Sequence, residues 1–177
     1  MKAKKLLTTV VCVLGLSGCV GVSPDGKGYT VTVPMNVINS TVGENFPQSQ
    51  KTSYGTLLID KPNILGKQGS DKLGVGTSFR FSNMLMPSGI KGRIALSSGL
   101  RYNPQDRGLY LASPMVDEIA FQDFALSKYI TPQMRQLIGD LVAQKLLSKP
   151  IYRMNNISSF VKGVGVHNGN VQVTVGL

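Results

Sequence analysis

An alternation of apolar and polar residues in the middle of the chain restricts its fold more than any other feature. In residues 73–81 the even positions are glycine, serine or arginine, and the odd positions are Leu73, Val75, Thr77, Phe79 and Phe81. Residues 90–101 repeat this pattern, and one of their faces carries Ile90, Ile94, Leu96 and Leu100. A period of two is typical of a strand with one face on a core and the other in water. The pattern predicts an antiparallel meander of about four strands over residues 56–124.

Helices and a hairpin are predicted on either side of this meander. Residues 131–149 have apolar side chains at helical spacing, begin at Thr131 as an N-cap with Pro132 behind it, and stop before Pro150. A short helix is expected after Pro34, and Asn168-Gly169 predicts a type I′ hairpin turn between residues 160–166 and 171–175. Pro114 cannot donate to a ladder, so residues 109–121 should form a strand with a bulge or at an edge. Together these elements predict one two-layer α+β domain over residues 29–177.

The first 18 residues have the organisation of an export signal. Lysines precede an apolar stretch over residues 6–16, which is shorter than the ~20 residues a membrane-spanning helix needs. The stretch leads into Leu16-Ser17-Gly18-Cys19, which resembles the bacterial lipobox. The resemblance implies cleavage between Gly18 and Cys19, a diacylglycerol thioether on Cys19 and an acyl chain, such as palmitate, on its new amino group. The alternative is a secreted protein that carries a cysteine here by chance.

Removal of the signal also removes Cys12, so the mature chain would hold only Cys19 and no intramolecular disulfide. Residues 19–28 are rich in Gly, Ser and Pro and are expected to be a flexible tether. Loss of the three signal lysines lowers the formal net charge from +10 to +7. A basic chain is compatible with nucleic acid, but an exported lipoprotein rarely meets it. Anionic lipid head groups suit the compartment better, and a basic domain without an ionic partner is the alternative.

Residues with catalytic potential are sparse. His167 is the one histidine and adjoins the predicted turn, where we expect a solvated side chain. Asp117 and Glu118 are adjacent acids, and on a regular strand they point to opposite faces. The serine pairs at 97–98 and 158–159 lie in no Gly-x-Ser-x-Gly elbow. We therefore expect neither an enzyme nor a metal or cofactor site.

Apolar side chains are the remaining candidates for a site. If the sheet closes around the long helix, they are simply core. If it closes incompletely, they line a groove for acyl chains. The residues expected on this apolar lining are Val75, Phe79, Phe81, Leu96, Met115, Leu137 and Leu141.

The chain resembles the YceB-like bacterial lipoproteins over nearly its whole mature length. The similar segments are Tyr29-Thr30-Val31-Thr32, the strand Leu109-Tyr110-Leu111…Val116-Asp117, and Lys149-Pro150-Ile151-Tyr152-Arg153. The function of that family is uncharacterised, and it contributes no catalytic residues. The resemblance implies a fold like the tubular lipid-binding (TULIP) group, with a long curved antiparallel sheet wrapped around a C-terminal helix and an apolar channel. It also implies a Gram-negative envelope, where Val20 after the cysteine indicates sorting to the periplasmic face of the outer membrane.

The expected function is that of an outer-membrane-anchored periplasmic lipoprotein that binds a lipid or another hydrophobic ligand. The alternative is a non-catalytic envelope scaffold or protein-docking domain with a filled core. The expected partners are the membrane, through the anchor, and a hydrophobic ligand, but not nucleic acid; a protein partner stays open. Ligand pockets of about 300–1,000 Å³ would separate the two hypotheses, since a scaffold would be packed solid.

Overall fold

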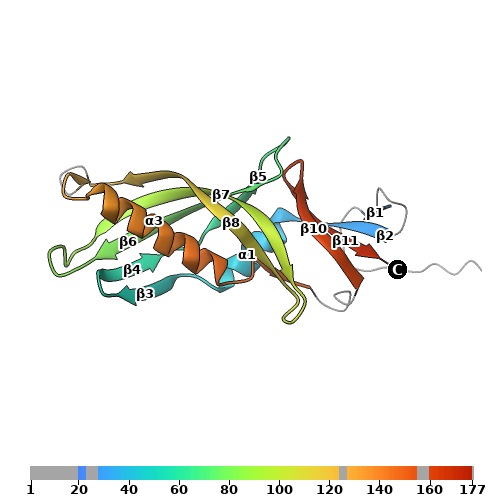
Figure 1. Ribbon diagram of the computed structural model, residues 1–177, viewed down its shortest axis with the longest axis horizontal. Coiled ribbons are helices and arrows are strands. Elements are labelled where there is room, and N and C mark those ends of the chain that lie inside the picture. The colour runs from blue at the N-terminus through green and yellow to red at the C-terminus, as the bar shows by residue number, and fades with distance from the viewer. Residues whose placement is uncertain (1–19, 23–27, 124–126, 155–159, 177) are drawn as a thin grey trace, which may run out of the picture.

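The computed structural model describes residues 20–22, 28–123, 127–154 and 160–176 of the 177-residue chain. Within them the chain forms two open antiparallel sheets together with the helices α1 and α3 (Figure 1). This arrangement confirms the α+β class and the antiparallel, curved sheet expected from the sequence. Residues 1–18 and Cys19 lie outside the described residues, so the expected signal and lipidation site have no structural description.

The larger sheet contains the predicted meander. Its strand order is β3-β4-β6-β7-β8-β9, and β5 pairs with β6. The strands are β3 (Gln48–Thr52), β4 (Gly55–Ile59), β5 (Asn63–Gly66), β6 (Leu73–Ser82), β7 (Ile90–Asn103), β8 (Gly108–Phe121) and β9 (Tyr152–Arg153). The sequence predicted about four strands here; the structure divides residues 55–121 into five and adds β3 and β9 at the two edges.

The smaller sheet joins the two ends of the described chain. Its order is β1-β2-β11-β10, formed by β1 (Val20–Val22), β2 (Gly28–Val33), β11 (Asn170–Gly176) and β10 (Val161–His167). The hairpin turn has φ of 49° at Asn168 and 73° at Gly169, which confirms the predicted type I′ turn. Residues 20–22 belong to the expected tether, but they pair with β2, so this part of the tether is strand.

The helices have the predicted positions. In α3 (Pro132–Leu147), the Thr131 side chain accepts a hydrogen bond from the Met134 amide at 3.2 Å, and Pro132 occupies the first turn. The helix packs against β8 and, less extensively, against β4. The shorter α1 (Met35–Glu44) follows Pro34 as expected and packs against β5 and β9.

The sheet face toward α3, called here the inner face, carries the core. Val75 and Leu96 are directly paired across β6 and β7, and both are buried. Phe79 lies opposite Gly92, where an added Cβ would come 2.5 Å from the Phe79 ring. Glycine at position 92 therefore makes room for this ring, which packs edge-on against Phe121 with 5.9 Å between centroids.

Strand β8 contains two register shifts against β7, each with one additional residue in β8. The first separates the Gly99–Ala112 pair from the Ser97–Met115 pair, and Ser113 between them has φ of 46°. This irregularity confirms the bulge predicted at Pro114. The second separates the Leu96–Val116 pair from the Ala95–Glu118 pair. Each shift moves the following side chains to the other face of the strand, because side chains alternate with a period of two.

Candidate hydrophobic-ligand site

The apolar layer between the large sheet and α3 is the candidate site, and four of the predicted lining residues meet there. Val75, Phe79 and Phe81 project from alternate positions of β6, and Leu96 projects from β7. All four belong to the buried core, with exposed fractions of 1–2%. The alternation of apolar and polar residues in the sequence therefore identified correctly which side chains of β6 and β7 point to the inner face.

Met115 is not part of this layer. Its side chain is 57% exposed, and the Lys72 ammonium lies 3.7 Å from its sulfur. The additional residue at the Ser113–Pro114 bulge reverses the alternation, so Val116 rather than Met115 is paired with inward-facing Leu96. The sequence held a signal for this: a bulge at Pro114 was expected, and a bulge shifts every later side chain by one position.

Helix α3 supplies the other side of the layer. Leu141 is buried and Leu137 is half-buried, both in contact with the core. The helix lies close to the sheet at Gly139, where an added Cβ would lie 3.2 Å from Ile119 Cδ1 and 3.4 Å from Val116 Cγ2. A side chain at position 139 would require the Ile119 methyl group to shift by a few tenths of an ångström, so glycine allows this close packing without any such shift.

The large sheet has a free edge beside α3. β8 pairs with β7 along one side, but on its other side it pairs with β9 only at Gly108 and Leu109. Over residues 112–121 this edge has no strand partner within the described chain. Arg135 of α3 covers part of it, since its guanidinium donates to the Ile119 carbonyl at 3.0 Å and lies 5.1 Å from the Phe121 ring centroid. Helix α3 and this edge therefore form an apolar seam. It is defined by Ile119, Phe121, Met134 and Leu137, which pack against the core, and by Val116, which is 42% exposed and lies beside Gly139.

Buried polar groups in the layer are already satisfied. Thr77 donates to the Asp60 carbonyl at 2.9 Å, and Ser98 donates to the Ala112 carbonyl at 2.9 Å. Among the described residues, every buried side-chain nitrogen and oxygen has a hydrogen-bond partner. The interior thus offers apolar contacts and no vacant hydrogen-bonding group, which suits a hydrocarbon chain better than a polar ligand.

The interior is closely packed at the end where α1 and α3 converge. A cavity of about 10 Å³ lies there, between α1, β5, β6 and the end of α3, and it is lined by Val42, Phe46, Pro62, Ile64, Val75, Leu111, Leu146, Lys149, Pro150 and Ile151. This volume is comparable to a single water-sized probe and far below the about 300–1,000 Å³ of ligand pockets.

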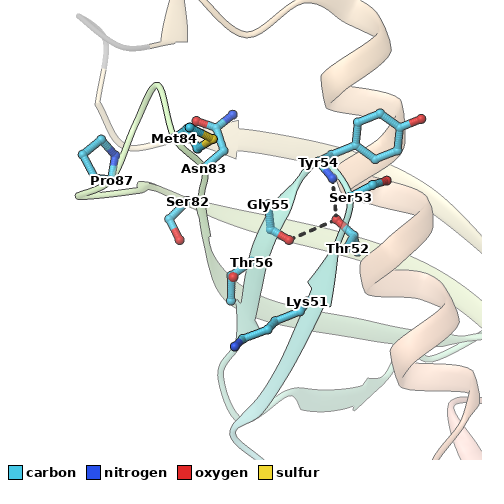
Figure 2. Close-up of a pocket in the computed structure, with 10 residues that line it drawn as sticks. All are labelled: Lys51, Thr52, Ser53, Tyr54, Gly55, Thr56, Ser82, Asn83, Met84 and Pro87. Carbon is cyan, nitrogen blue, oxygen red and sulfur yellow. Dashed lines mark hydrogen bonds between the residues drawn. The ribbon is translucent and has the colours of Figure 1, made fainter.

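Larger hollows lie on the outside of the sheet. One of about 700 Å³ follows the outer faces of β6, β7 and β8 and includes Lys61, Arg93 and Glu118. Another of about 470 Å³ lies between the β3–β4 turn and the β6–β7 loop (Figure 2). Both are open and include polar side chains, so neither is the expected apolar channel.

The acids and the histidine considered as catalytic candidates each lie in a different environment. The register shift at Asp117 lets its carboxylate accept from the Ser97 hydroxyl at 3.0 Å, while Glu118 lines the outer hollow. The expectation that these two acids point to opposite faces assumed a regular strand, and the shift removes that assumption. His167 is exposed at the end of β10, and no group of three His, Cys, Asp or Glu in the described part of the chain is arranged as metal ligands.

The chain matches no family model and no curated protein sequence.

Proposed function

We propose that the protein is a non-catalytic lipoprotein on the periplasmic face of the outer membrane that binds the hydrocarbon part of a lipid between α3 and the inner face of the large sheet. The observation that carries this proposal is the apolar seam between α3 and the unpaired edge of β8. In a closed barrel or a fully paired sheet the interior would be sealed. Here a ligand reaches the core by separating a helix from an edge strand, without breaking strand pairs.

The contacts across the seam are compatible with such a movement. At Gly139 the helix presents backbone to Val116 and Ile119, and such a contact lacks interlocking side chains. The hydrogen bond from Arg135 to the Ile119 carbonyl links the exposed side of the helix to the edge. Beneath the seam, Phe121 contacts Phe79, so an entering chain would meet the buried residues of the inner face directly.

Because the interior is closely packed near the end of α3, binding of a ligand there requires a movement of the protein. The cavity beside the C-terminal end of α3 holds only about 10 Å³, so an acyl chain that enters there has to displace side chains or α3 itself. We infer that the unliganded domain is closed and that α3 moves outward as the ligand enters. Buried apolar side chains stabilise the closed form, so ligand contacts must replace them.

The attachment to the membrane rests on the lipobox at residues 16–19. The described residues contain no helix long and apolar enough to cross a bilayer. The outer-membrane location rests on the residue after Cys19 and on the resemblance to the YceB-like lipoproteins.

A reversible crosslink across the seam tests the binding mode. An added Cβ at Gly139 would lie 3.4 Å from Val116 Cγ2. The sulfur of a cysteine at position 116 can take the place of this γ carbon, so cysteines at the two positions are near enough to be joined by a disulfide. The Gly139→Cys/Val116→Cys protein is purified oxidised or reduced, mixed with phospholipid, and analysed for bound lipid by native mass spectrometry. We expect lipid on the reduced form and its loss on oxidation, whereas Gly139→Cys alone should bind in both states.

Absence of lipid from both the reduced double variant and the parent protein would contradict the proposal. That outcome would favour the second candidate, a lipid-anchored scaffold with a filled core. The specific observation in favour of this second candidate is the same small cavity, because a docking domain needs no interior space.

A further inference from the structure

A cluster of exposed apolar side chains lies at one end of the molecule and takes no part in the core. Met84 and Leu85, in the loop between β6 and β7, are 99% and 90% exposed. Tyr54, in the β3–β4 turn, is also exposed and lines the same hollow as Met84 (Figure 2). This end of the large sheet, called here the distal end, lies opposite the small sheet that contains β1 (Figure 1).

The loop is built to hold these side chains outward. The Asn83 carboxamide accepts from the Leu85 amide at 3.0 Å and from the Met86 amide at 2.8 Å, and the Met86 carbonyl accepts from Gly89 at 3.0 Å. The turn is thus closed by its own hydrogen bonds before any partner arrives. Little conformational freedom would be lost when the loop is buried, and each buried apolar side chain would favour partition by about tenfold or more.

Positive charge surrounds this loop. Arg80 and Lys91 are exposed and lie directly opposite each other across β6 and β7. Like charges in this position are destabilising, and neither has an ion-pair partner among the described residues. Lys51 lines the hollow beside Tyr54. Lys128 lies near Tyr129 in the short segment that precedes α3, and α3 begins at the same end of the molecule (Figure 1).

We propose that the distal end docks on an anionic phospholipid bilayer, with Met84 and Leu85 inserted at the acyl boundary and the basic residues on the head-group phosphates. Exposed apolar side chains alone would suit a protein as well as a membrane. The unneutralised Arg80–Lys91 pair favours a surface of many negative charges, which attracts each nearby cation. This docking is independent of ligand binding in the core. Because β1 lies at the opposite end, a chain anchored through Cys19 would present this loop to a second bilayer.

The absence of tryptophan from the chain allows a position-specific test. In the full chain, Leu85→Trp places one fluorophore on the loop, and Leu65→Trp places one at an exposed leucine of β5, which is 59% exposed and lies away from the distal end. Both proteins are mixed with vesicles of phosphatidylglycerol and phosphatidylethanolamine carrying brominated acyl chains. We expect a blue shift and quenching at position 85 and neither at position 65, even where the N-terminal segment also holds the protein to the vesicle.

Charge variants test the electrostatic part. Arg80→Gln with Lys91→Gln, in the Leu85→Trp background, should weaken vesicle partition by roughly 30-fold, because each cation near an anionic surface contributes about fivefold. Thermal melts of all variants check that the exposed substitutions leave the fold intact. Equal signals at positions 85 and 65 would overturn the proposal, as would quenching that is unchanged in phosphatidylcholine or in the charge variant. A blue shift that requires envelope proteins instead of vesicles would assign the surface to a protein partner.

Discussion

Asp106 and Tyr110 are coupled at the turn between β7 and β8. The Tyr110 hydroxyl donates a hydrogen bond to the Asp106 carboxylate, and the Arg101 guanidinium lies 4.5 Å from the centroid of the Tyr110 ring. This hydrogen bond favours the charged carboxylate and is the main cause that lowers the pKa of Asp106 below 3.8. The same bond, followed by burial, raises the pKa of Tyr110 above 10.0.

Replacement of Tyr110 by phenylalanine should return the pKa of Asp106 toward 3.8. Because the folded pKa is lowered, the pair stabilises the fold at pH values above the unfolded pKa, and this stabilisation is lost as the pH falls through the folded pKa. The variant should lack that part of the acid dependence. Carboxyl NMR titration of both proteins measures the shift, and an unchanged Asp106 titration would contradict the assigned cause.

Leu141 tests the packing of one side chain of α3. It is buried among the core residues, so Leu141→Ala should lower the free energy of unfolding by about 2–5 kcal/mol. Gln144, on the exposed side of the same helix, provides the control, and Gln144→Ala should change stability by less than about 0.5 kcal/mol. Urea unfolding measures both variants. Equal effects would mean that α3 is not held by the inner face.

At the scale of elements, the relation between α3 and the large sheet depends on the two register shifts of β8. Without them Met115 would face the interior and Val116 the solvent. The shifts instead place Val116 and Ile119 beside Gly139 of α3. The Arg135 contacts and the irregular, partly charged edge also protect β8 from pairing with another chain, a hazard of any exposed edge strand.

Enlargement of an inner-face residue measures the free space in this layer. Val75 is 2% exposed and lines the cavity of about 10 Å³, so Val75→Phe should destabilise the domain by about 1–3 kcal/mol through overpacking. Val37→Phe on the exposed part of α1 provides a Val-to-Phe control with little expected effect. Thermal melts and lipid extraction are performed on each protein. Unchanged stability of Val75→Phe with less bound lipid would instead indicate an open channel.

At the scale of the whole molecule, the two sheets meet through backbone at two glycines. An added Cβ at Gly66, the last residue of β5, would lie 1.6 Å from the Gly169 carbonyl oxygen. The Gly169 amide also donates to the Ser70 carbonyl at 3.2 Å. The turn of the β10–β11 hairpin therefore rests on the large sheet, and β10 contacts β7 elsewhere.

Gly66→Ala should disturb this junction, because its methyl group would overlap backbone that cannot rotate away. We expect a loss of at least about 1–3 kcal/mol in the free energy of unfolding, as in overpacked cores. Gly76→Ala on neighbouring β6 is the matched control, since an added Cβ there meets nothing within 4 Å. Urea unfolding compares the two, and equal stabilities would show that the junction tolerates the added methyl group.

Cys19→Ala should abolish lipid attachment, since alanine has no thiol to form the thioether. Labelled palmitate should be incorporated into the parent protein and not into the variant, and globomycin should block processing of the parent alone. Ser23→Ala, four residues later, is the control for a nearby substitution that leaves the lipobox intact. Label that persists on the alanine variant would exclude Cys19 as the attachment site.

Local chemistry in the sequence was sufficient to predict the long strands β6 and β7, the helix α3 and the β10–β11 turn, but not the short strands β1, β3, β5 and β9. The strands over residues 73–81 and 90–101 follow from a period of two, the helix from Thr131 follows from its cap and spacing, and the turn follows from Asn168-Gly169. Each depends on residues that are neighbours in the chain. The inward positions of Val75, Phe79, Phe81 and Leu96 were predictable for the same reason, because β6 and β7 are regular there.

Only the tertiary structure decided how these elements meet. The pairing of β2 with β11, which creates a second sheet, joins residues from opposite ends of the chain, and no local pattern encodes that choice. Val116 rather than Met115 faces inward because of the positions at which β8 contains an additional residue relative to β7. The small interior cavity likewise follows from the packing of several distant segments together. Sequence periodicity specifies which face of an element is apolar, whereas partner, register and free volume arise from contacts between residues far apart in the chain.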